Sequence, residues 1–515
     1  MLVPRSSGVL FHPTSLPGRY GMGDLGDWSY RFVDWLESAY QTIWQILPLG
    51  PTSYGDSPYQ TLSAFAGNAF LISFDKLIAE GWLAAEDLAD VPEFPNDHVD
   101  FGWIIPYHNE LLTLAHKNFT EKANAVQTKA FADWCVENTD WLDDYALFSA
   151  LKDEHGGRPW VEWTPGEALR DPQALVDAQT RHTDEIENYK FRQWLFFRQW
   201  LDVKAYANNK SIKLVGDVPI FVAHDSADVW ANRTLFYLDD LGNPTVIAGV
   251  PPDYFSETGQ RWGNPLYNWE AMAKDGYSWW IRRFKAALKQ VDLVRIDHFR
   301  GFEAYWEVPA SEATAVRGQW VPGPGIPFFK VIEAALGHLP IIAEDLGVIT
   351  AGVEAMRDNL ELPGMKVLQF AWGNLPEANL FLPHHHIPNS VVYSGTHDNN
   401  TTIGWWNSEE TDVHIHHHLQ LYVNHDITEP NWELIRLAEA STSHIAVVPM
   451  QDVLSLGAEA RMNTPGLPSG NWSWRMVEEN FADVAARDRL RDLTLLYGRA
   501  HGTRFVEFLH EHPMI

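Results

Sequence analysis

The segment 293–300, Leu-Val-Arg-Ile-Asp-His-Phe-Arg, places an arginine two residues before a carboxylate at the end of an apolar run. We expect the run to form a buried strand. Because side chains two apart in a strand point to the same face, Arg295 and Asp297 should lie side by side. A neighbouring cation keeps a carboxylate ionised, as a nucleophile requires. A structural ion pair at a strand end fits the same residues, so this segment alone leaves both interpretations open.

Three further apolar runs also end in acidic residues. They are Gly216-Asp217-Val218-Pro219, Ala343-Glu344-Asp345-Leu346-Gly347 and Gly395-Thr396-His397-Asp398-Asn399-Asn400. Any one of them fits a helix cap or a buried pair. Convergent carboxylates with few basic partners instead fit chemistry at a glycosidic bond, where one acid protonates the leaving oxygen and one carboxylate attacks the sugar or stabilises its cation. Two nearby carboxylates also raise the pKa of one of them, which supplies the acid.

Buried strands must position these segments, and the chain carries eight candidates. They span residues 8–12, 42–49, 213–222, 293–299, 341–346, 365–372, 390–397 and 443–451. Most show few alternating polar residues, as strands buried on both faces do. Helical patterns at 280–291, 328–336 and 432–440 each precede one of them. The pattern predicts an α/β fold, a (β/α)8 TIM barrel rather than a doubly wound sheet, with catalytic groups at the carboxyl ends of its strands.

Two long intervals interrupt the expected barrel, which we take as a single catalytic body over residues 1–515. Roughly 160 residues separate the second and third strands, too many for a simple crossover. We therefore predict an inserted, mainly helical subdomain at 52–211. A second insertion at 223–275 is rich in Pro, Gly, Asp and aromatic residues, and is predicted to be a loop region.

Composition excludes several classes of partner. The 38 basic residues are outnumbered by 68 acidic ones, and the formal charge of -30 repels nucleic acid and anionic membranes. The single cysteine excludes an intramolecular disulfide and a cysteine-based metal cluster. With no run of about 18 apolar residues and no signal-like start, a soluble, cytoplasmic protein is expected. The 24 Trp suit a protein that stacks on the flat faces of sugars.

The four acidic segments resemble the signature regions of the α-amylase clan. Their residue sequences are similar to those of the 4-α-glucanotransferases, the amylomaltases or disproportionating enzymes of glycoside hydrolase family 77. Three other segments carry the same resemblance: Phe11-His12-Pro13-Thr14-Ser15-Leu16-Pro17-Gly18, Ser57-Pro58-Tyr59-Gln60 and Asn463-Thr464-Pro465-Gly466. It implies transfer of α-1,4-glucan segments to the 4-hydroxyl of an acceptor by a retaining double displacement. The implied substrates are maltooligosaccharides, amylose, starch or glycogen. Side chains fill every role, so no cofactor or metal is expected.

The resemblance also implies roles for single residues. Asp297 would be the nucleophile, Glu344 the general acid/base and Asp398 a third carboxylate that binds hydroxyls of the distorted sugar. Segment 249–265 resembles the family's lid over the cleft, so the insertion at 223–275 would form an active-site lid. The implied substrate-binding residues are Ser57, Tyr59, Asp217, Asp253, Gln260, Trp262, Arg295, Asp345, His397 and Asn463. Within this set Tyr59 would stack on the transferred glucose, and Arg295 would hold Asp297 ionised.

Three alternatives remain. An α-1,4-glucan hydrolase would use the same carboxylates and differ only in admitting water to the intermediate, although Pro219-Ile220 replaces the Asn-His that usual calcium-dependent amylases carry there. A metal enzyme is suggested by the histidines at 384–386 and 414–418, since His414 and His418 are spaced to share a helical face. Solvated histidines explain them equally well. An inactive glucan-binding protein would not need a nucleophile and an acid together.

Overall fold

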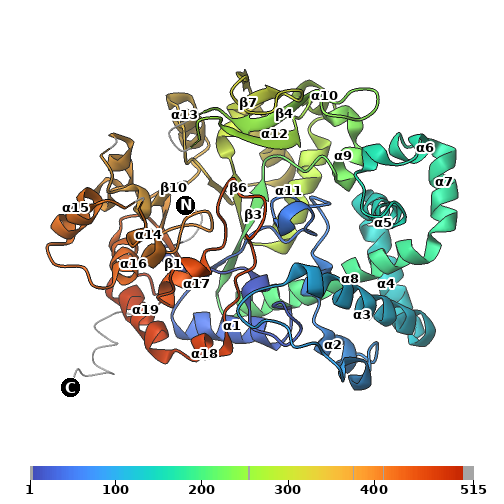
Figure 1. The fold of residues 1–515 in the computed structure, drawn as a ribbon, viewed down its shortest axis with the longest axis horizontal. Helices are drawn as coiled ribbons and strands as arrows, with labels where there is room; N and C mark the ends of the chain where they lie inside the picture. Colours follow the sequence, from blue (N-terminus) through green and yellow to red (C-terminus); the bar gives the residue numbers. More distant parts are fainter. Residues whose placement is uncertain (1–3, 253–255, 375, 410, 501, 503–515) are drawn as a thin grey trace.

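Eight parallel strands form the central sheet of the computed structural model, which describes residues 4–252, 256–374, 376–409, 411–500 and 502 (Figure 1). Their order is β10-β11-β12-β1-β2-β3-β6-β9. The strands are β1 (Ser6–Leu10), β2 (Ile43–Gln45), β3 (Lys213–Pro219), β6 (Leu293–Asp297), β9 (Ile341–Ala343), β10 (Gly364–Val367), β11 (Ser390–Tyr393) and β12 (Ile445–Pro449). The backbone N–H of Ala343 donates to the carbonyl of Pro363 at 2.9 Å, which joins β9 to the start of β10. The predicted barrel is therefore confirmed, and each of its strands overlaps a predicted segment.

Burial explains why these segments are strands. Every residue of β1, β11 and β12 is buried, as expected for parallel strands covered on both faces. Outside the two long intervals, the described chain forms the helices α1 (Asp27–Ser38), α11 (Ser278–Gln290), α12 (Gly325–Leu336), α13 (Ala351–Asn359), α14 (Thr402–Trp406), α15 (Val413–Val423), α16 (Pro430–Ala440), α17 (Met450–Val453), α18 (Glu478–Phe481) and α19 (Val484–Leu496). Helices α11, α12 and α16 match the three predicted helical patterns. In the described part of the chain, no helix has both the length and the apolar character needed to cross a membrane.

The interval between β2 and β3 is helical, and its helices lie at the right of Figure 1. They are α2 (Phe74–Ala79), α3 (Phe101–Lys122), α4 (Ala125–Glu137), α5 (Thr139–Glu154), α6 (Pro165–Ala168), α7 (Pro172–Arg181) and α8 (Thr183–Asn209). Helix α8 contacts α3, α4 and α5, but it also contacts α1, α11 and β3. The indole N–H of Trp200, on α8, donates to the carbonyl of Gln290 at 2.9 Å. Helix α8 thus serves both the inserted helices and the barrel wall.

The segment 223–275 is more regular than predicted. It contains α9 (Ala227–Ala231), β4 (Val246–Val250), β5 (Gln260–Pro265) and α10 (Trp269–Lys274). Strands β4 and β5 join β7 (Ala304–Pro309) and β8 (Gln319–Pro322) in an antiparallel sheet of order β5-β4-β7-β8, at the top of Figure 1. The prediction of a loop region was wrong for β4 and β5. Strand β4 pairs with β7, which lies beyond β6 in the sequence, and local residue types do not reveal such a distant partner.

The amino-terminal floor of the barrel is tied together by one buried arginine. Arg499, 0% exposed, donates to the carbonyl oxygens of Ser6 and Glu439 at 2.9 Å each and of Ser443 at 3.0 Å. Its Nε also lies 3.3 Å from the Glu439 carboxylate, whose side chain is fully buried. This guanidinium therefore joins the end of α19 to β1 and to the residues that precede β12.

Replacing Arg499 by Met should lower the melting temperature strongly, because it removes a cation from beside a buried carboxylate and several hydrogen-bond donors from buried carbonyl groups. Loss of one partner from a buried ion pair costs about 3–5 kcal/mol. As a control, Lys129→Gln removes the exposed pair with Asp133 (2.6 Å), which contributes about 0–1 kcal/mol. Differential scanning fluorimetry measures both variants. Equal melting temperatures for the two would show that Arg499 is not a main tie of the floor.

Candidate active site

One arginine bridges two carboxylates at the carboxyl end of the barrel. Strands β3 and β6 pair with Asp217 opposite Arg295, and residues opposite each other in neighbouring strands face the same side. The Nη1 atom of Arg295 donates to Asp217 Oδ2 at 2.6 Å and to Asp297 Oδ1 at 3.1 Å. The Arg295 and Asp217 side chains are 3% and 0% exposed. The predicted neighbourhood of Arg295 and Asp297 is thus present in the structure.

Tyr59 completes one side of this group. Its hydroxyl donates to Asp217 Oδ2 at 2.9 Å, and its ring stacks on His397 with 5.2 Å between centroids. Its backbone N–H donates to Ser57 Oγ at 3.2 Å. The other oxygen of Asp217, Oδ1, is buried and has no hydrogen-bond donor among the described residues. An unsatisfied buried acceptor costs about 1–3 kcal/mol, so a hydroxyl donor from a ligand would bind favourably there.

Glu344 follows β9 and is held by backbone donors. Its Oε2 accepts the N–H of His298 at 2.7 Å, and its Oε1 accepts the N–H of Leu346 at 2.8 Å. The carbonyl of Glu344 also accepts the N–H of Phe299 at 3.1 Å. His298 has left-handed backbone angles, with φ 52° and ψ 49°, which turn the chain directly after Asp297. The turn after Asp297 therefore fixes the position of the Glu344 carboxylate.

Glu344 and Asp297 are both buried, but they differ in the partners that hold them. Burial raises the pKa of Glu344, and the Asp297 charge adds to this; against the opposing charge of Arg295, the pKa reaches about 8. Burial also raises the pKa of Asp297, but Arg295 opposes that shift through a direct hydrogen bond. Near neutral pH this favours the protonated form of Glu344, whereas Asp297 is the carboxyl group that has a cation as its direct partner. Two carboxyl groups in opposite states are the requirement for acid and nucleophile at a glycosidic bond.

Asp398 is held at the same rim by polar groups. Asn463 Nδ2 donates to its Oδ1 at 2.6 Å, and His397 Nε2 lies 3.4 Å from its Oδ2. Arg461 Nη2 donates to its carbonyl at 2.9 Å. Burial lowers the pKa of His397, which favours the neutral ring. The Asp398 side chain is 44% exposed and remains accessible to a ligand.

The antiparallel sheet reaches this rim through β5. The ring of Trp262 meets the ring of His298 edge to face, with centroids 4.8 Å apart. Its indole N–H donates to Gln260 Oε1 at 3.2 Å. Trp262 therefore lies next to the turn that follows Asp297, and Gln260 is bonded to Trp262. The third predicted lid residue, Asp253, lies outside the described residues.

The comparisons with known proteins agree with this geometry. A family model described as 4-alpha-glucanotransferase, Glyco_hydro_77, matches residues 11–479. The chain belongs to this family. The 4-alpha-glucanotransferase of Synechocystis is 50% identical over 504 residues, covering 97% of this chain and 99% of that protein. The 4-alpha-glucanotransferase of Thermus thermophilus is 51% identical over 485 residues, covering 93% and 96%.

A solved structure extends the agreement to the fold. The amylomaltase from Streptococcus agalactiae in complex with acarbose superimposes with a TM-score of 0.93 at 38% identity, covering 96% of this chain and 99% of that one. The family, the barrel and the 4-alpha-glucanotransferase activity predicted from the sequence are thereby confirmed. The roles of single residues in this glucanotransferase rest on the geometry of the site.

Asp345 is the one predicted substrate-binding residue of the described part that is not brought to the group around Arg295. Its carboxylate accepts Arg357 Nη1 at 2.5 Å and the N–H of Met365 at 2.7 Å. Neighbouring residues of an extended chain point to opposite sides, so Asp345 turns away as Glu344 turns in. Its role toward substrate stays a prediction.

Some contacts of the site were not predicted from the sequence. The backbone N–H groups of His298 and Leu346 hold Glu344, and Trp472 packs on Tyr59 with 5.6 Å between centroids. The Nε of Arg295 lies 3.4 Å from the sulfur of Met365. Backbone donors cannot be recognised from residue type. Trp472, in contrast, lies close in the sequence to the Asn463 motif, and this closeness could have indicated that it belongs to the site.

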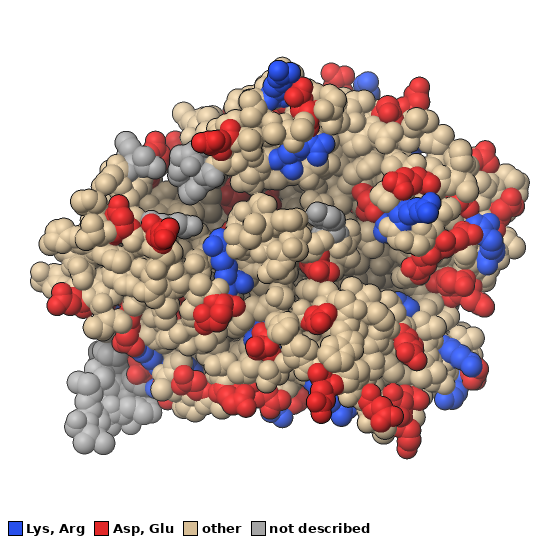
Figure 2. Space-filling view, in the orientation of Figure 1, with Lys and Arg blue, Asp and Glu red and all other residues tan. Residues whose placement is uncertain are grey.

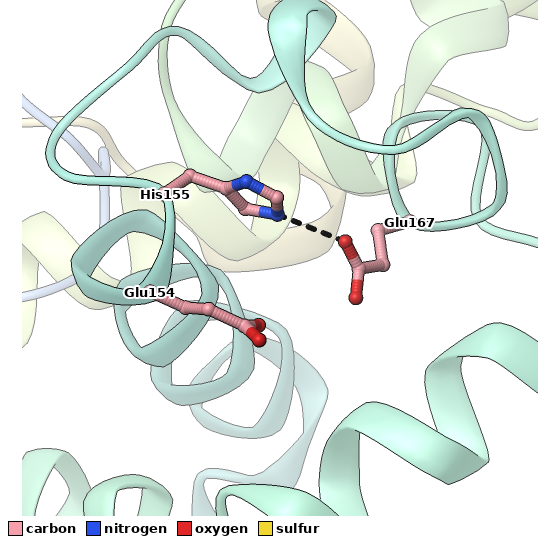
Figure 3. Close-up of side chains that lie close together, drawn as sticks. All are labelled: Glu154, His155 and Glu167. Carbon is pink, nitrogen blue, oxygen red and sulfur yellow. Dashed lines mark hydrogen bonds and ion pairs between the residues drawn. The ribbon is translucent and has the colours of Figure 1, made fainter.

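The histidines at 384–386 and 414–418 do not belong to any group with metal-ligand spacing in the described part of the chain. Among the described residues, the one group with metal-ligand spacing is Glu154, His155 and Glu167, shown in Figure 3. His155 Nε2 lies 2.9 Å from Glu167 Oε2, and Arg181 Nη2 donates to Glu154 Oε2 at 2.8 Å and Glu167 Oε1 at 2.7 Å. Because the guanidinium already lies between the two carboxylates, this group is an ion-pair network joining α5, α6 and α7.

Three of the histidines considered as metal ligands contact aromatic residues and backbone instead. His416 Nε2 bonds the carbonyl of Trp406 at 2.9 Å, and its ring stacks on the same indole. His418 Nδ1 bonds the carbonyl of Trp372 at 3.0 Å. His384 stacks on Tyr422 with 5.8 Å between centroids. Each of these rings is thus held by its own neighbours.

The protonation states predict the alkaline limb of the pH profile. As pH rises through about 8, Glu344 loses the proton that the leaving oxygen needs, so kcat/KM for maltotriose should fall. A maltotriosyl fluoride donor needs no such proton, because fluoride leaves unaided. Fluoride release should therefore persist above pH 8. An equal alkaline loss with both donors would assign that limb to a group other than Glu344.

Proposed function

We propose that this glucanotransferase works by a retaining double displacement at Asp297 and Glu344. Asp297 attacks the anomeric carbon of an α-1,4-glucan while Glu344 gives its proton to the departing 4-oxygen. A glycosyl ester then joins Asp297 to the donor segment. Glu344, now ionised, takes the proton from the 4-hydroxyl of the acceptor, whose oxygen displaces Asp297 and restores the α-linkage.

The observation that carries this proposal is the shared support of the two groups. Arg295 bonds Asp297 at 3.1 Å and so favours the ionised nucleophile. Glu344 lacks an ion pair within the described residues and is instead held by two N–H groups, one of them from the residue after Asp297. The fixed turn keeps the two carboxyl groups in one arrangement, so neither must reorganise during the reaction.

The remaining polar groups suit the transferred glucose. Asp217 Oδ1, buried without a donor, would accept a sugar hydroxyl, and the Tyr59 ring offers a face on which that glucose would stack. Asp398, oriented by Asn463, would accept hydroxyl hydrogen bonds that strengthen as positive charge develops on the ring. The proposal thus uses side chains alone.

Maltooligosaccharides, amylose, starch or glycogen are the proposed substrates, because the relatives at about half identity are named 4-alpha-glucanotransferases. The S. agalactiae amylomaltase was solved with acarbose. Acidic side chains outnumber basic ones on the face shown in Figure 2, which disfavours nucleic acid and anionic lipid as partners. A cytoplasmic location is also proposed and is tested by cell fractionation.

Replacing Asp297 by Asn should abolish the redistribution of maltotriose. Loss of a nucleophile typically lowers kcat by a factor on the order of 10⁴ to 10⁶. Chromatography of the products should show glucose and a ladder of longer maltooligosaccharides for the unmodified protein, and unchanged maltotriose for the variant. Its circular dichroism spectrum should be unchanged. Full activity would remove Asp297 from the nucleophile role, whereas glucose and maltose without longer products from the unmodified protein would favour the hydrolase alternative.

The Trp262 ring should limit access of water to the glycosyl ester, because it lies against the turn beside Asp297. Trp262→Ala should therefore raise the ratio of hydrolysis to transfer, measured as reducing ends gained per maltotriose consumed. Trp320→Ala is the matched control, since it removes an indole from β8 at the opposite edge of the same sheet. An unchanged ratio in Trp262→Ala, or an equal rise in both variants, would contradict this role of the lid.

A further inference from the structure

A buried carboxylate lies behind the segment that carries Asp398. Asp452, in α17 directly after β12, is 1% exposed. Its Oδ2 accepts the hydroxyls of Ser394 at 2.6 Å and Thr402 at 2.7 Å, and its Oδ1 accepts the N–H of Thr402 at 2.7 Å. No Lys, Arg or His of the described chain forms an ion pair with it. Hydroxyl and backbone groups are therefore its main stabilisation.

The three donors come from the two ends of one loop. Ser394 follows β11 and Thr402 begins α14, and both are fully buried. Between them lie His397 and Asp398, the predicted sugar-binding pair. Asp452 thereby closes this loop at its base, where the chain enters and leaves. The base is anchored to α16, because Asn431 Nδ2 donates to the Asp452 carbonyl at 2.8 Å.

Inside the loop, the backbone is held by polar contacts. Asn399 Oδ1 accepts both the N–H and the hydroxyl of Thr396 at 2.9 Å each. Gln369 Nε2 donates to the carbonyl of Asn400 at 3.0 Å. Hydrogen bonds fix direction more strictly than apolar contacts do, so the positions of the loop's two ends are transmitted to the residues between them.

The buried charge of Asp452 is not explained by a gain in the stability of the fold. Taking a carboxylate out of water costs several kcal/mol, and well-packed apolar residues often replace buried charges without loss of stability. A carboxylate does, however, accept three hydrogen bonds on two oxygens, and no apolar residue could hold both loop ends in this way. The contribution of Asp452 is therefore to the geometry of the loop rather than to the stability of the fold.

We propose that Asp452 is a positioning residue for glucan transfer, which holds Ser394 and Thr402 together and so keeps His397 and Asp398 in the geometry that the transition state requires. The inference rests on the proposed role of Asp398. Asp452 itself contacts neither substrate nor the reacting atoms.

A double-mutant cycle tests this role. Asp452→Ala should lower kcat for maltotriose by about 10- to 100-fold with a smaller change in KM, since misplacement by about 1 Å can cost 10²-fold. Asp452→Asn should keep most activity, because both hydroxyls can reverse and accept from the amide. In an Asp398→Asn background, Asp452→Ala should cost much less, because the group it positions is already impaired. An equal cost in both backgrounds would overturn the proposal.

Glu439→Gln supplies a matched control at the other end of the barrel. Glu439 is also a fully buried carboxylate, which accepts the Ser7 hydroxyl and lies near Arg499. This variant should lower the melting temperature and leave kcat unchanged. A similar fall of kcat in Glu439→Gln and Asp452→Ala, at similar loss of melting temperature, would reduce the effect to general destabilisation and overturn the proposal.

Single donors provide the test if Asp452→Ala does not fold. Thr402→Val and Ser394→Ala each remove one hydroxyl and should each lower kcat by about 3- to 10-fold, in line with about 0.5–1.5 kcal/mol for one hydrogen bond. Full activity in both would overturn the positioning role. If Asp398→Asn alone retained full activity, the proposed function of Asp398 would fail instead, and the two failures are therefore distinguishable.

Discussion

The buried contact of Arg295 with Asp217 and Asp297 is the interaction on which the rest of the active site depends. Two carboxylates in one buried space repel each other and resist ionisation. The guanidinium opposes both effects, with N–O distances of 2.6 and 3.1 Å. It can do so only because β3 and β6 pair with Asp217 opposite Arg295. The register of two barrel strands thus places the cation beside Asp297, the proposed nucleophile.

Glu344, at the same rim, is held by backbone groups rather than by a cation. Backbone N–H groups hold both of its oxygens, and its nearest carboxylate neighbour disfavours its charge. The N–H of His298 points correctly only because that residue adopts a left-handed conformation, which costs roughly 1–2 kcal/mol for a residue other than glycine. The strained backbone of His298, next to Asp297, thereby fixes the direction of the N–H group that holds Glu344. One turn thus holds Asp297 and Glu344, the proposed nucleophile and acid, in a fixed arrangement.

The sequence was informative where the physics is local. Strands buried on both faces are continuous apolar runs, and β11 and β12 were predictable for that reason. That the acidic residues after β3, β6, β9 and β11 meet at one rim followed from the chain order of a barrel. The donors to Glu344, the pairing of β4 with β7 and the contacts of Asp452 were not predictable, because each joins residues that meet only in the folded chain. The direction of Asp345, in contrast, was predictable from the sequence, since strand alternation turns it away from the side on which Glu344 lies.

The two ends of the barrel use buried polar groups for different purposes. At the amino-terminal floor, Arg499 bonds several carbonyl groups at once, so many weak contacts add up in one place and contribute to stability. At the carboxyl-terminal rim, each reactive group depends on one or two directed bonds, as Asp398 does on Asn463. Removing such a bond exposes few apolar atoms and changes stability little, but it changes direction, to which a transition state is sensitive. Stability and rate are therefore set by separate polar groups of one barrel.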